Sequence, residues 1–133
     1  MWWAVRPYSR DVRWIVDAMN VVGARPDGWW KDRRGALSSL IERLEQWART
    51  TGAEVTVVLE QPMSPALQSD LIAVRQAPRA GPNSADDEIV RLVRADGEPG
   101  DITVVTSDGA LSARVGAVGA ATFPAGRFRD LLD

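Results

Sequence analysis

Short runs of hydrophobic residues along the chain predict a series of buried strands. Each run is four to six residues long, is rich in valine and isoleucine, and is bounded by polar or turn-forming residues. Continuously apolar runs of this kind are typical of strands that are covered on both faces. In chain order, the predicted strands cover residues 13–17, 55–59, 71–74 (the most peripheral), 102–106 and 118–123.

Between these runs, hydrophobic side chains recur at the spacing of amphipathic helices. The longest helix is predicted to begin at Asp32 and to end at Thr50-Thr51-Gly52, and a second one covers residues 85–95. A short helix or turn is expected over 109–115, and Phe128, Leu131 and Leu132 indicate a terminal helical turn.

This alternation of strands and helices predicts an α/β fold with a mainly parallel central sheet flanked by helices. Residues 21–31 and 77–83 are expected to form loops, since proline, glycine and polar residues interrupt them. The first twelve residues are interpreted as a polar leader, which leaves one domain over 13–133. The total length of 133 residues suits a single hydrophobic core.

Composition narrows the chemistry that the chain can perform. It has neither cysteine nor histidine, so disulfides, thiolate or imidazole metal ligands and a Ser-His-Asp triad are excluded. Acid–base or metal chemistry must then rest mainly on Asp and Glu, whose oxygens suit Mg²⁺, Mn²⁺ or Ca²⁺. The net charge of −2 excludes a globally basic nucleic-acid binder. No apolar segment has the length of a signal peptide or membrane span, so a cytoplasmic protein without membrane contact is expected.

Acidic residues follow the predicted strands at a position where ligands bind in open α/β sheets. Asp17, Glu60 and Asp108 come at or just after strand ends, and Asp86 and Asp87 open a predicted helix. If the strands are parallel, these carboxyl groups converge at one edge of the sheet. Carboxylates in close contact cannot all remain ionised without a counter-cation, so the pattern favours a divalent metal that polarises a phosphoryl oxygen.

Each acidic motif also has a purely structural interpretation. Asp17 and Asn20 are typical of a strand-to-loop turn, because their side chains bond to nearby backbone. Residues 84–87 fit a capping box in which Ser84 is the N-cap and Asp87 reaches back. Residues 106–109 fit a turn or another N-cap, and Glu60 fits a solvated loop acid. The metal interpretation therefore depends on all four sites falling at one edge.

The motifs, taken in order, resemble the NYN domains of the PIN-like nuclease superfamily, and particularly the YacP-like branch. Asp17-Ala18-Met19-Asn20 resembles the family's Asp-Gly-Tyr-Asn, and Val58-Leu59-Glu60 resembles its Val-Phe-Asp strand end. Residues 83–87 resemble its Glu-Thr-Ala-Asp helix start, and Thr106-Ser107-Asp108 matches its Thr-Ser-Asp. A helix with Arg34 and spaced leucines, which the family also has, lies between the first two of these motifs. The resemblance covers roughly residues 13–123.

This resemblance implies a three-layer PIN-like fold and metal-dependent RNA cleavage with Mg²⁺ or Mn²⁺. It nominates four metal-site acids, with Asn20 as a supporting polar catalytic residue; the acids are Asp17, Asp86, Asp87 and Asp108. Three departures from the family pattern bear on that site. Asn83 stands in place of a Glu, Glu60 in place of an Asp, and Ala18-Met19 in place of Gly-Tyr.

A nuclease also needs cations and stacking surfaces beside its acidic site, and residues 25–34 offer both. Cations that could form an RNA-binding rim are Arg25, Lys31, Arg33 and Arg34. Trp29 and Trp30 could stack on unpaired bases, which favours single-stranded RNA. The alternative is a solvated Arg-rich loop whose tryptophans cap the core or fill a dimer contact.

Three function classes are compatible with these patterns in decreasing order of support. The first is a metal-dependent ribonuclease, and the second is an RNA-binding or adaptor module of the same fold with weak or no activity, as the changes at Asn83 and Glu60 suggest. The third, a phosphotransfer receiver or phosphatase, lacks paired acids after the first strand and an Asp-x-Asp motif. A homodimer through Trp2 and Trp3 is one arrangement, and a ribosome or antitoxin partner is left open.

Overall fold

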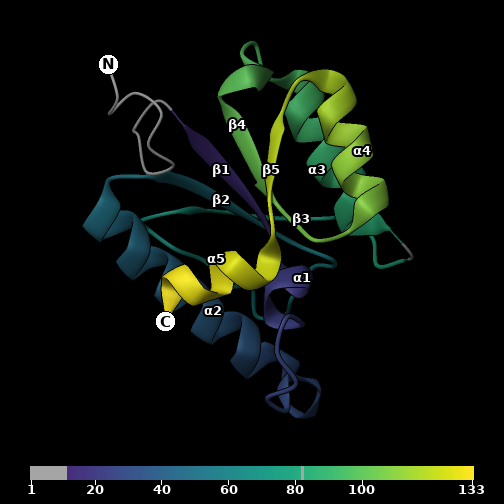
Figure 1. Cartoon of the computed structure of the whole chain (residues 1–133). Helices are drawn as coiled ribbons and strands as arrows, with labels where there is room; N and C mark the ends of the chain where they lie inside the picture. The colour runs from purple at the N-terminus through teal and green to yellow at the C-terminus, as the bar shows by residue number, and fades with distance from the viewer. Residues whose placement is uncertain (1–11, 82) are drawn as a thin grey trace.

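The fold is built around a five-stranded parallel sheet. The structure is a computed structural model, and it describes residues 12–81 and 83–133. The strands lie in the order β3-β2-β1-β4-β5, with β1 at the centre (Figure 1). Their bounds are β1 Arg13–Asp17, β2 Glu54–Leu59, β3 Ala73–Gln76, β4 Ile102–Val105 and β5 Ala121–Phe123. Every neighbouring pair is parallel, so the predicted α/β class is confirmed.

The central strands are buried on both faces because successive side chains alternate between two hydrophobic clusters. Trp14 and Val16 of β1 enter one cluster, whereas Ile15 enters the other. In the same way Val57 of β2 faces the first cluster and Val58 the second. The uninterrupted apolar sequence of these strands is thus explained by two covering layers.

Helices form those two outer layers, which makes the domain three layers thick. On one face lie α1 (Ala18–Val22), α2 (Arg33–Thr51) and α5 (Ala125–Leu132). On the other lie α3 (Ser84–Ala95) and α4 (Gly109–Val118) (Figure 1). Alternate placement of helices on both faces of a parallel sheet is the expected way to bury it.

Several boundaries differ from those predicted from sequence. The predicted loop over 21–31 contains the end of α1 and a 3₁₀ turn at Trp29–Lys31. The edge strand β3 lies two residues later than predicted, and α4 runs on to Val118, where Gly119 adopts a positive φ of 109° and ends it. The terminal turn is a full helix, α5, because it buries one face. The predicted leader, residues 1–12, lies outside the described residues except for Val12.

Aromatic rings fill the centre of the first hydrophobic cluster. Trp14 of β1 packs edge-on against Trp47 of α2, with ring centroids 5.3 Å apart. Phe128 of α5 contacts both rings, at 5.6 Å and 5.1 Å, and Phe123 of β5 lies against it. Offset and edge-to-face pairs add to the free energy gained by burying the rings. This cluster joins a central strand, an edge strand and two helices.

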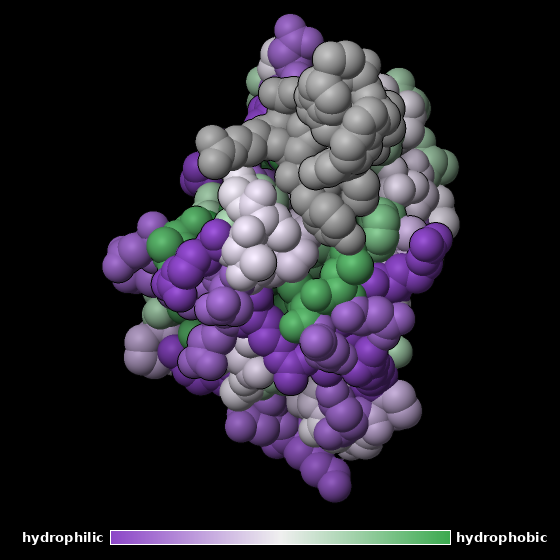
Figure 2. Space-filling view, turned by 60° about the vertical axis from the view of Figure 1, so that its left-hand side comes forward, coloured by the Kyte–Doolittle hydropathy of each residue, from purple (hydrophilic) through white to green (hydrophobic). Residues whose placement is uncertain are grey.

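The coloured part of the face shown in Figure 2 is mostly hydrophilic, with only small apolar areas between hydrophilic residues. Large hydrophobic side chains exposed among the described residues are Trp30, Leu71 and Leu131. They are scattered along the chain, as single surface hydrophobic residues are in ordinary proteins. Within the described ranges, no helix combines the length and the apolar character that crossing a bilayer requires.

Truncation of Phe128 tests whether α5 is part of the core. Phe128 is fully buried, so Phe128→Ala should lower the free energy of unfolding by about 3–5 kcal/mol. Leu131→Ala, in the same helix but 36% exposed, is the matched control and should change it by less than about 0.5 kcal/mol. Urea titration followed by circular dichroism measures both. Equal effects of the two substitutions would contradict a core role for α5.

Candidate functional site

The candidate site lies where the strand order reverses. The chain runs outward from β1 to β2 and β3, then crosses to β4 and β5 on the other side of β1. The carboxyl ends of β1 and β4 therefore flank the position at which open α/β sheets bind ligands. Asp17 is the last residue of β1, and Asp108 follows β4 by three residues. The sequence prediction that these acids share one edge is met.

Two polar contacts join the ends of β1 and β4. The Thr106 hydroxyl donates to Asp17 Oδ2 at 3.1 Å, and both residues are buried. Asn20 Oδ1 accepts a hydrogen bond from the backbone N–H of Ser107 at 2.8 Å. Asp17 and Asn20 thus do more than shape a local turn, because their partners lie almost ninety residues away.

A hollow of about 220 Å³ opens at this edge, and we call it the acidic hollow. Three of its acids come from different elements: Asp17 from β1, Asp86 from α3 and Asp108 from the start of α4. Its other polar residues are Glu60, Asn20, Asn83 and Ser84. The Ser84 hydroxyl donates to the backbone carbonyl of Glu60 at 2.7 Å, which ties the start of α3 to the end of β2.

Burial and mutual repulsion oppose ionisation in the acidic hollow. Burial is the main cause that raises the pKa of Asp17 from 3.8 to about 6, and the nearby charges of Asp86 and Asp108 add to it. The Thr106 hydrogen bond acts in the opposite direction but does not offset burial. Burial, followed by the charge of Asp108, also raises the pKa of Asp86, while Arg114 acts against this rise.

The structure does not bring Asp87 into the hollow. Its exposed carboxylate pairs with Arg114 of α4 at 3.0 Å. The capping-box interpretation is wrong, because Asn83 is the N-cap, with a φ of 60°, and Ser84 bonds to Glu60 instead. Asp86 and Asp87 thus point to different neighbours although they are adjacent in sequence.

Asp108 caps a helix and also borders the acidic hollow. Its Oδ1 accepts a hydrogen bond from the Leu111 N–H at 3.0 Å and so caps α4, as the structural interpretation predicted. Its carboxylate also lines the acidic hollow. Glu60 lines the hollow too, where it forms an exposed ion pair with Arg33 at 3.3 Å.

The donor set of the acidic hollow fits a hard divalent cation. Carboxylate and amide oxygens line the hollow, and oxygens of these kinds are the ligands that Mg²⁺ and Mn²⁺ prefer. Over residues 12–81 and 83–133, no three acidic side chains stand close enough together to form a complete metal-binding set. Mg²⁺ commonly uses only one or two carboxylates and completes its shell with water and substrate phosphates.

The predicted basic rim is only partly assembled at this edge. Arg33 lies beside Glu60 and over the ring of Trp29, 5.3 Å from its centroid. Arg34 donates to the carbonyl of Pro65 at 2.7 Å. Arg25 instead pairs with Asp130 and Asp133 of the C-terminal region. Lys31 is exposed at the end of the 3₁₀ turn.

The two tryptophans of this loop differ in environment. Trp29 is partly buried and packs against the first hydrophobic cluster, whereas Trp30 is 51% exposed. The two rings meet edge-on, with centroids 5.9 Å apart. Trp2 and Trp3, on which the predicted homodimer depends, lie outside the described residues.

Two neighbours of the site were not assigned a role from sequence, although Met19 was noted as a departure from the family pattern. Met19 of α1 borders the acidic hollow and the two hollows beside it. Arg114 reaches this edge from α4, five residues after the helix begins. Arg114 lies six residues after Asp108, outside the i,i+3 and i,i+4 spacings of helical pairs, so no local pattern indicated it.

Comparisons with known proteins agree with this geometry. A family profile described as a YacP-like NYN domain matches residues 14–133. Two crystal structures of Rae1 (YacP) from Bacillus subtilis share the fold at 23% identity. One is the structure of a mutant form: its TM-score is 0.72, and the match covers 91% of this chain and 76% of that chain. The other has a TM-score of 0.73, and the match covers 90% of this chain and 72% of that chain. None of the curated proteins compared with the chain matches it.

Asp17→Asn should stabilise the domain at neutral pH. Unfolded Asp17 loses its proton near pH 4 and folded Asp17 near pH 6, so the folded state loses stability as pH rises through this window. Asn removes this cost, which is about 2–3 kcal/mol above the window. The melting temperature should rise by roughly 5–10 °C at pH 8, with the gain shrinking toward pH 4. Thermal unfolding across this pH range measures it.

The control for that experiment is Asp101→Asn, an exposed acid beside β4 at the opposite edge of the sheet. It should shift the melting temperature little at any pH. A gain from Asp17→Asn that is the same at every pH would contradict the ionisation cost.

Proposed function

We propose that this chain, which belongs to the family of YacP-like NYN domains, is a ribonuclease that hydrolyses RNA phosphodiester bonds with Mg²⁺ or Mn²⁺. Its nuclease-type fold is the one shared with the Rae1 (YacP) structures. The observation that carries the proposal is the convergence of Asp17, Asp86 and Asp108 around one hollow. Three elements supply these acids at the switch point of the sheet.

The metal ion is proposed to take one or two carboxylate ligands from Asp17, Asp86 and Asp108, with Asn20 as a supporting polar group and with water or phosphate oxygens completing its shell. The raised pKa values of Asp17 and Asp86 support this choice, because such carboxyl groups gain most from a nearby cation. A bound dication would polarise a phosphoryl oxygen and stabilise the charge that develops on it. Asp87 would need to leave Arg114 to join them.

Proton transfer falls to the carboxylates, because the chain has no histidine. A bound dication would lower the pKa of Asp17 below the value of about 6 that it has without metal and would keep the carboxylate ionised. Its hydrogen bond from Thr106 holds the carboxylate in place. An attacking water within reach of these acids could deliver its proton to one of them.

Contacts to RNA are proposed for cations and aromatic groups around the acidic hollow. Arg114 and Arg33 each pair with an acid at its margin and could exchange that partner for a phosphate. Exposed pairs of this kind contribute little to stability, so the exchange costs little. Trp30 offers an exposed ring to an unpaired base, which favours single-stranded RNA as the substrate.

A second candidate is an RNA-binding module without hydrolytic activity. It is favoured by the ion pairs that neutralise Asp87 and Glu60, which leave fewer acids available to a metal. The two candidates differ in one respect only, namely whether RNA is cut.

The proposed hydrolysis is tested with labelled single-stranded RNA and Mn²⁺. Asp17→Asn and Asp108→Asn should each lower the cleavage rate at least about a hundredfold, since removal of one charge-stabilising group costs that much in other enzymes. Asp101→Asn, the same chemical change at the opposite sheet edge, should leave it unchanged. Gel analysis of cleavage products gives the rates.

EDTA should abolish cleavage by the wild-type protein without abolishing RNA binding. Equal cleavage by wild type and Asp17→Asn would indicate a contaminant and would sink the ribonuclease proposal. Binding without cleavage under every divalent ion would support the inactive module instead.

Metal binding can be measured separately from catalysis. Because an ion that binds only the folded state stabilises it, Mn²⁺ should raise the melting temperature of the wild-type protein. Asp86→Asn should reduce this rise strongly. Asp87→Asn should reduce it less, because Asp87 faces Arg114 rather than the hollow. Thermal shift titrations with MnCl₂ measure all three, and an equal rise in all of them would contradict the assigned ligands.

A further inference from the structure

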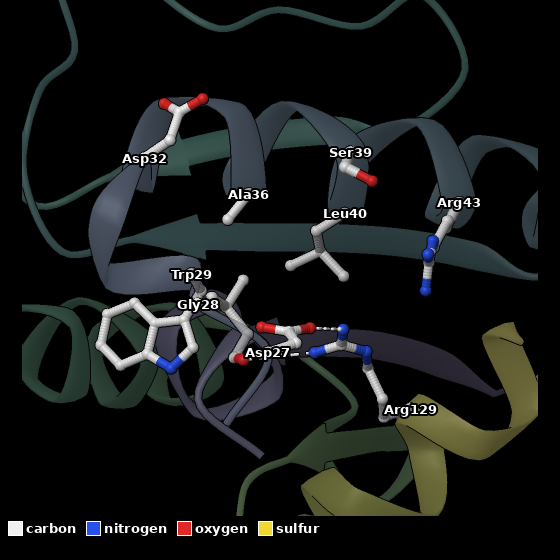
Figure 3. A pocket seen from close by; sticks show the side chains of 10 residues that line it. Asp27, Gly28, Trp29, Asp32, Ala36, Ser39, Leu40, Arg43 and Arg129 are labelled. Carbon is white, nitrogen blue, oxygen red and sulfur yellow. Dashed lines mark hydrogen bonds and ion pairs between the residues drawn. The ribbon is translucent and has the colours of Figure 1, made fainter. Parts of the chain in front are cut away.

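A second cavity, of about 260 Å³, lies between α2, α5 and the loop that joins α1 to α2; we call it the α2–α5 cavity. Figure 3 shows Ala36 and Leu40 pointing into it from α2, with Trp29 at one end and Arg43 and Arg129 at the other. Its volume is just below the range of drug-sized ligand pockets. It therefore suits a ligand about as large as one nucleobase.

Helix α1 contributes residues both to this cavity and to the acidic hollow. This helix begins directly after Asp17, and Asn20 within it lines the acidic hollow. Val22, its last residue, lines the α2–α5 cavity. Asn20 and Val22 are two residues apart and lie on opposite sides of α1. Because five helical residues rise only about 7.5 Å, a strand of RNA that enters both places has to pass around this short helix.

An ion-pair network gives this cavity a fixed wall. Arg129, whose side chain is only 13% exposed, donates to the carbonyls of Val21 and Val22 at 3.1 and 3.2 Å and to Asp27 at 2.7 Å. Asp27 is thereby held at the cavity in its ionised form, because the Arg129 hydrogen bond lowers its pKa. Arg43 pairs with Asp133 on the same side.

Both signs of charge line the cavity, which argues against a phosphate as its ligand. Asp27 and Asp32 would repel an anion, and Arg129 is already held by Asp27 and by two backbone carbonyls. A neutral ligand with both donors and acceptors matches such a lining. A nucleobase has that character, and its flat faces suit the apolar surface of Val22, Ala36 and Leu40.

We propose that the α2–α5 cavity binds one base of the RNA strand that crosses the acidic hollow, with a preference for guanine. The inference rests on the proposed function, since it takes RNA as the ligand. Guanine presents two adjacent donors, N1–H and the N2 amino group, to a carboxylate, and its O6 accepts from a guanidinium. Asp27 and Arg43 offer these complementary groups. Asp27 would bind the base while it keeps its hydrogen bond from Arg129, and Arg43 would exchange Asp133, its partner in an exposed ion pair, for O6. The other bases present no such pair of donors.

The test measures binding without cleavage. Fluorescence anisotropy in EDTA compares a short oligouridine with the same strand carrying one central guanosine, inosine or adenosine. The guanosine strand should bind about tenfold more tightly than oligouridine, the usual effect of one bidentate base contact. Inosine, which lacks the N2 amino group, should lose part of this gain, and adenosine most of it.

Two kinds of variant locate that preference. Asp27→Asn should remove the guanine preference, and Ala36→Leu should do so by filling the cavity. Ala117→Leu, the same change at an exposed position of α4, is the matched control and should keep it. If Ala36→Leu proves unfolded by circular dichroism, Ser39→Trp blocks the cavity from an exposed position of α2 instead.

Equal binding of all strands, a preference for another base, or a guanine preference that survives the cavity-filling variants would overturn the proposal. No measurable binding of any strand would overturn it as well. Cleavage with no guanine preference would contradict base binding in the α2–α5 cavity but not the proposed hydrolysis. A guanine preference in a protein that never cuts RNA would contradict the proposed hydrolysis but not base binding in the cavity.

Discussion

The Asp17 carboxylate, buried at the end of the central strand, is the constraint on which the rest of the site depends. It is 5% exposed and is held by the Thr106 hydroxyl across the gap between β1 and β4. The parallel register of these strands brings their ends to one level, so the residues that follow them must share the same edge. The acidic hollow is thus a direct consequence of sheet topology.

Such an arrangement lowers the stability of the domain, and other interactions must offset the loss. A buried carboxyl group with a raised pKa favours the unfolded state at neutral pH. The aromatic cluster around Trp14 and Phe128 contributes in the opposite direction on the face next to α2 and α5. Ion pairs between α5 and the loop after α1 then hold the Trp29 region in position. Costs of this kind are typical of functional sites.

The sequence was sufficient to predict that the strands are buried and parallel and that Asp17 and Asp108 share one edge of the sheet. It was also sufficient to predict the family, which the profile match over 14–133 confirms. These features depend on local periodicity and on a general rule of sheet topology. Side-chain partners were missed where they come from distant segments, as with Arg25 and α5 or Asp87 and Arg114. The predicted capping box was wrong because Asn83 is the N-cap and adopts a left-handed conformation, which no local sequence pattern indicated. The α2–α5 cavity depends on three segments and has no sequence signal.

A crystal of the protein soaked in Mn²⁺ tests the central claim most directly, because anomalous scattering locates the ion without reference to activity. We expect a peak in the acidic hollow, bordered by the Asp17 and Asp108 carboxylates. A hollow that stays empty at saturating Mn²⁺, or an ion bound only elsewhere on the surface, would contradict the account.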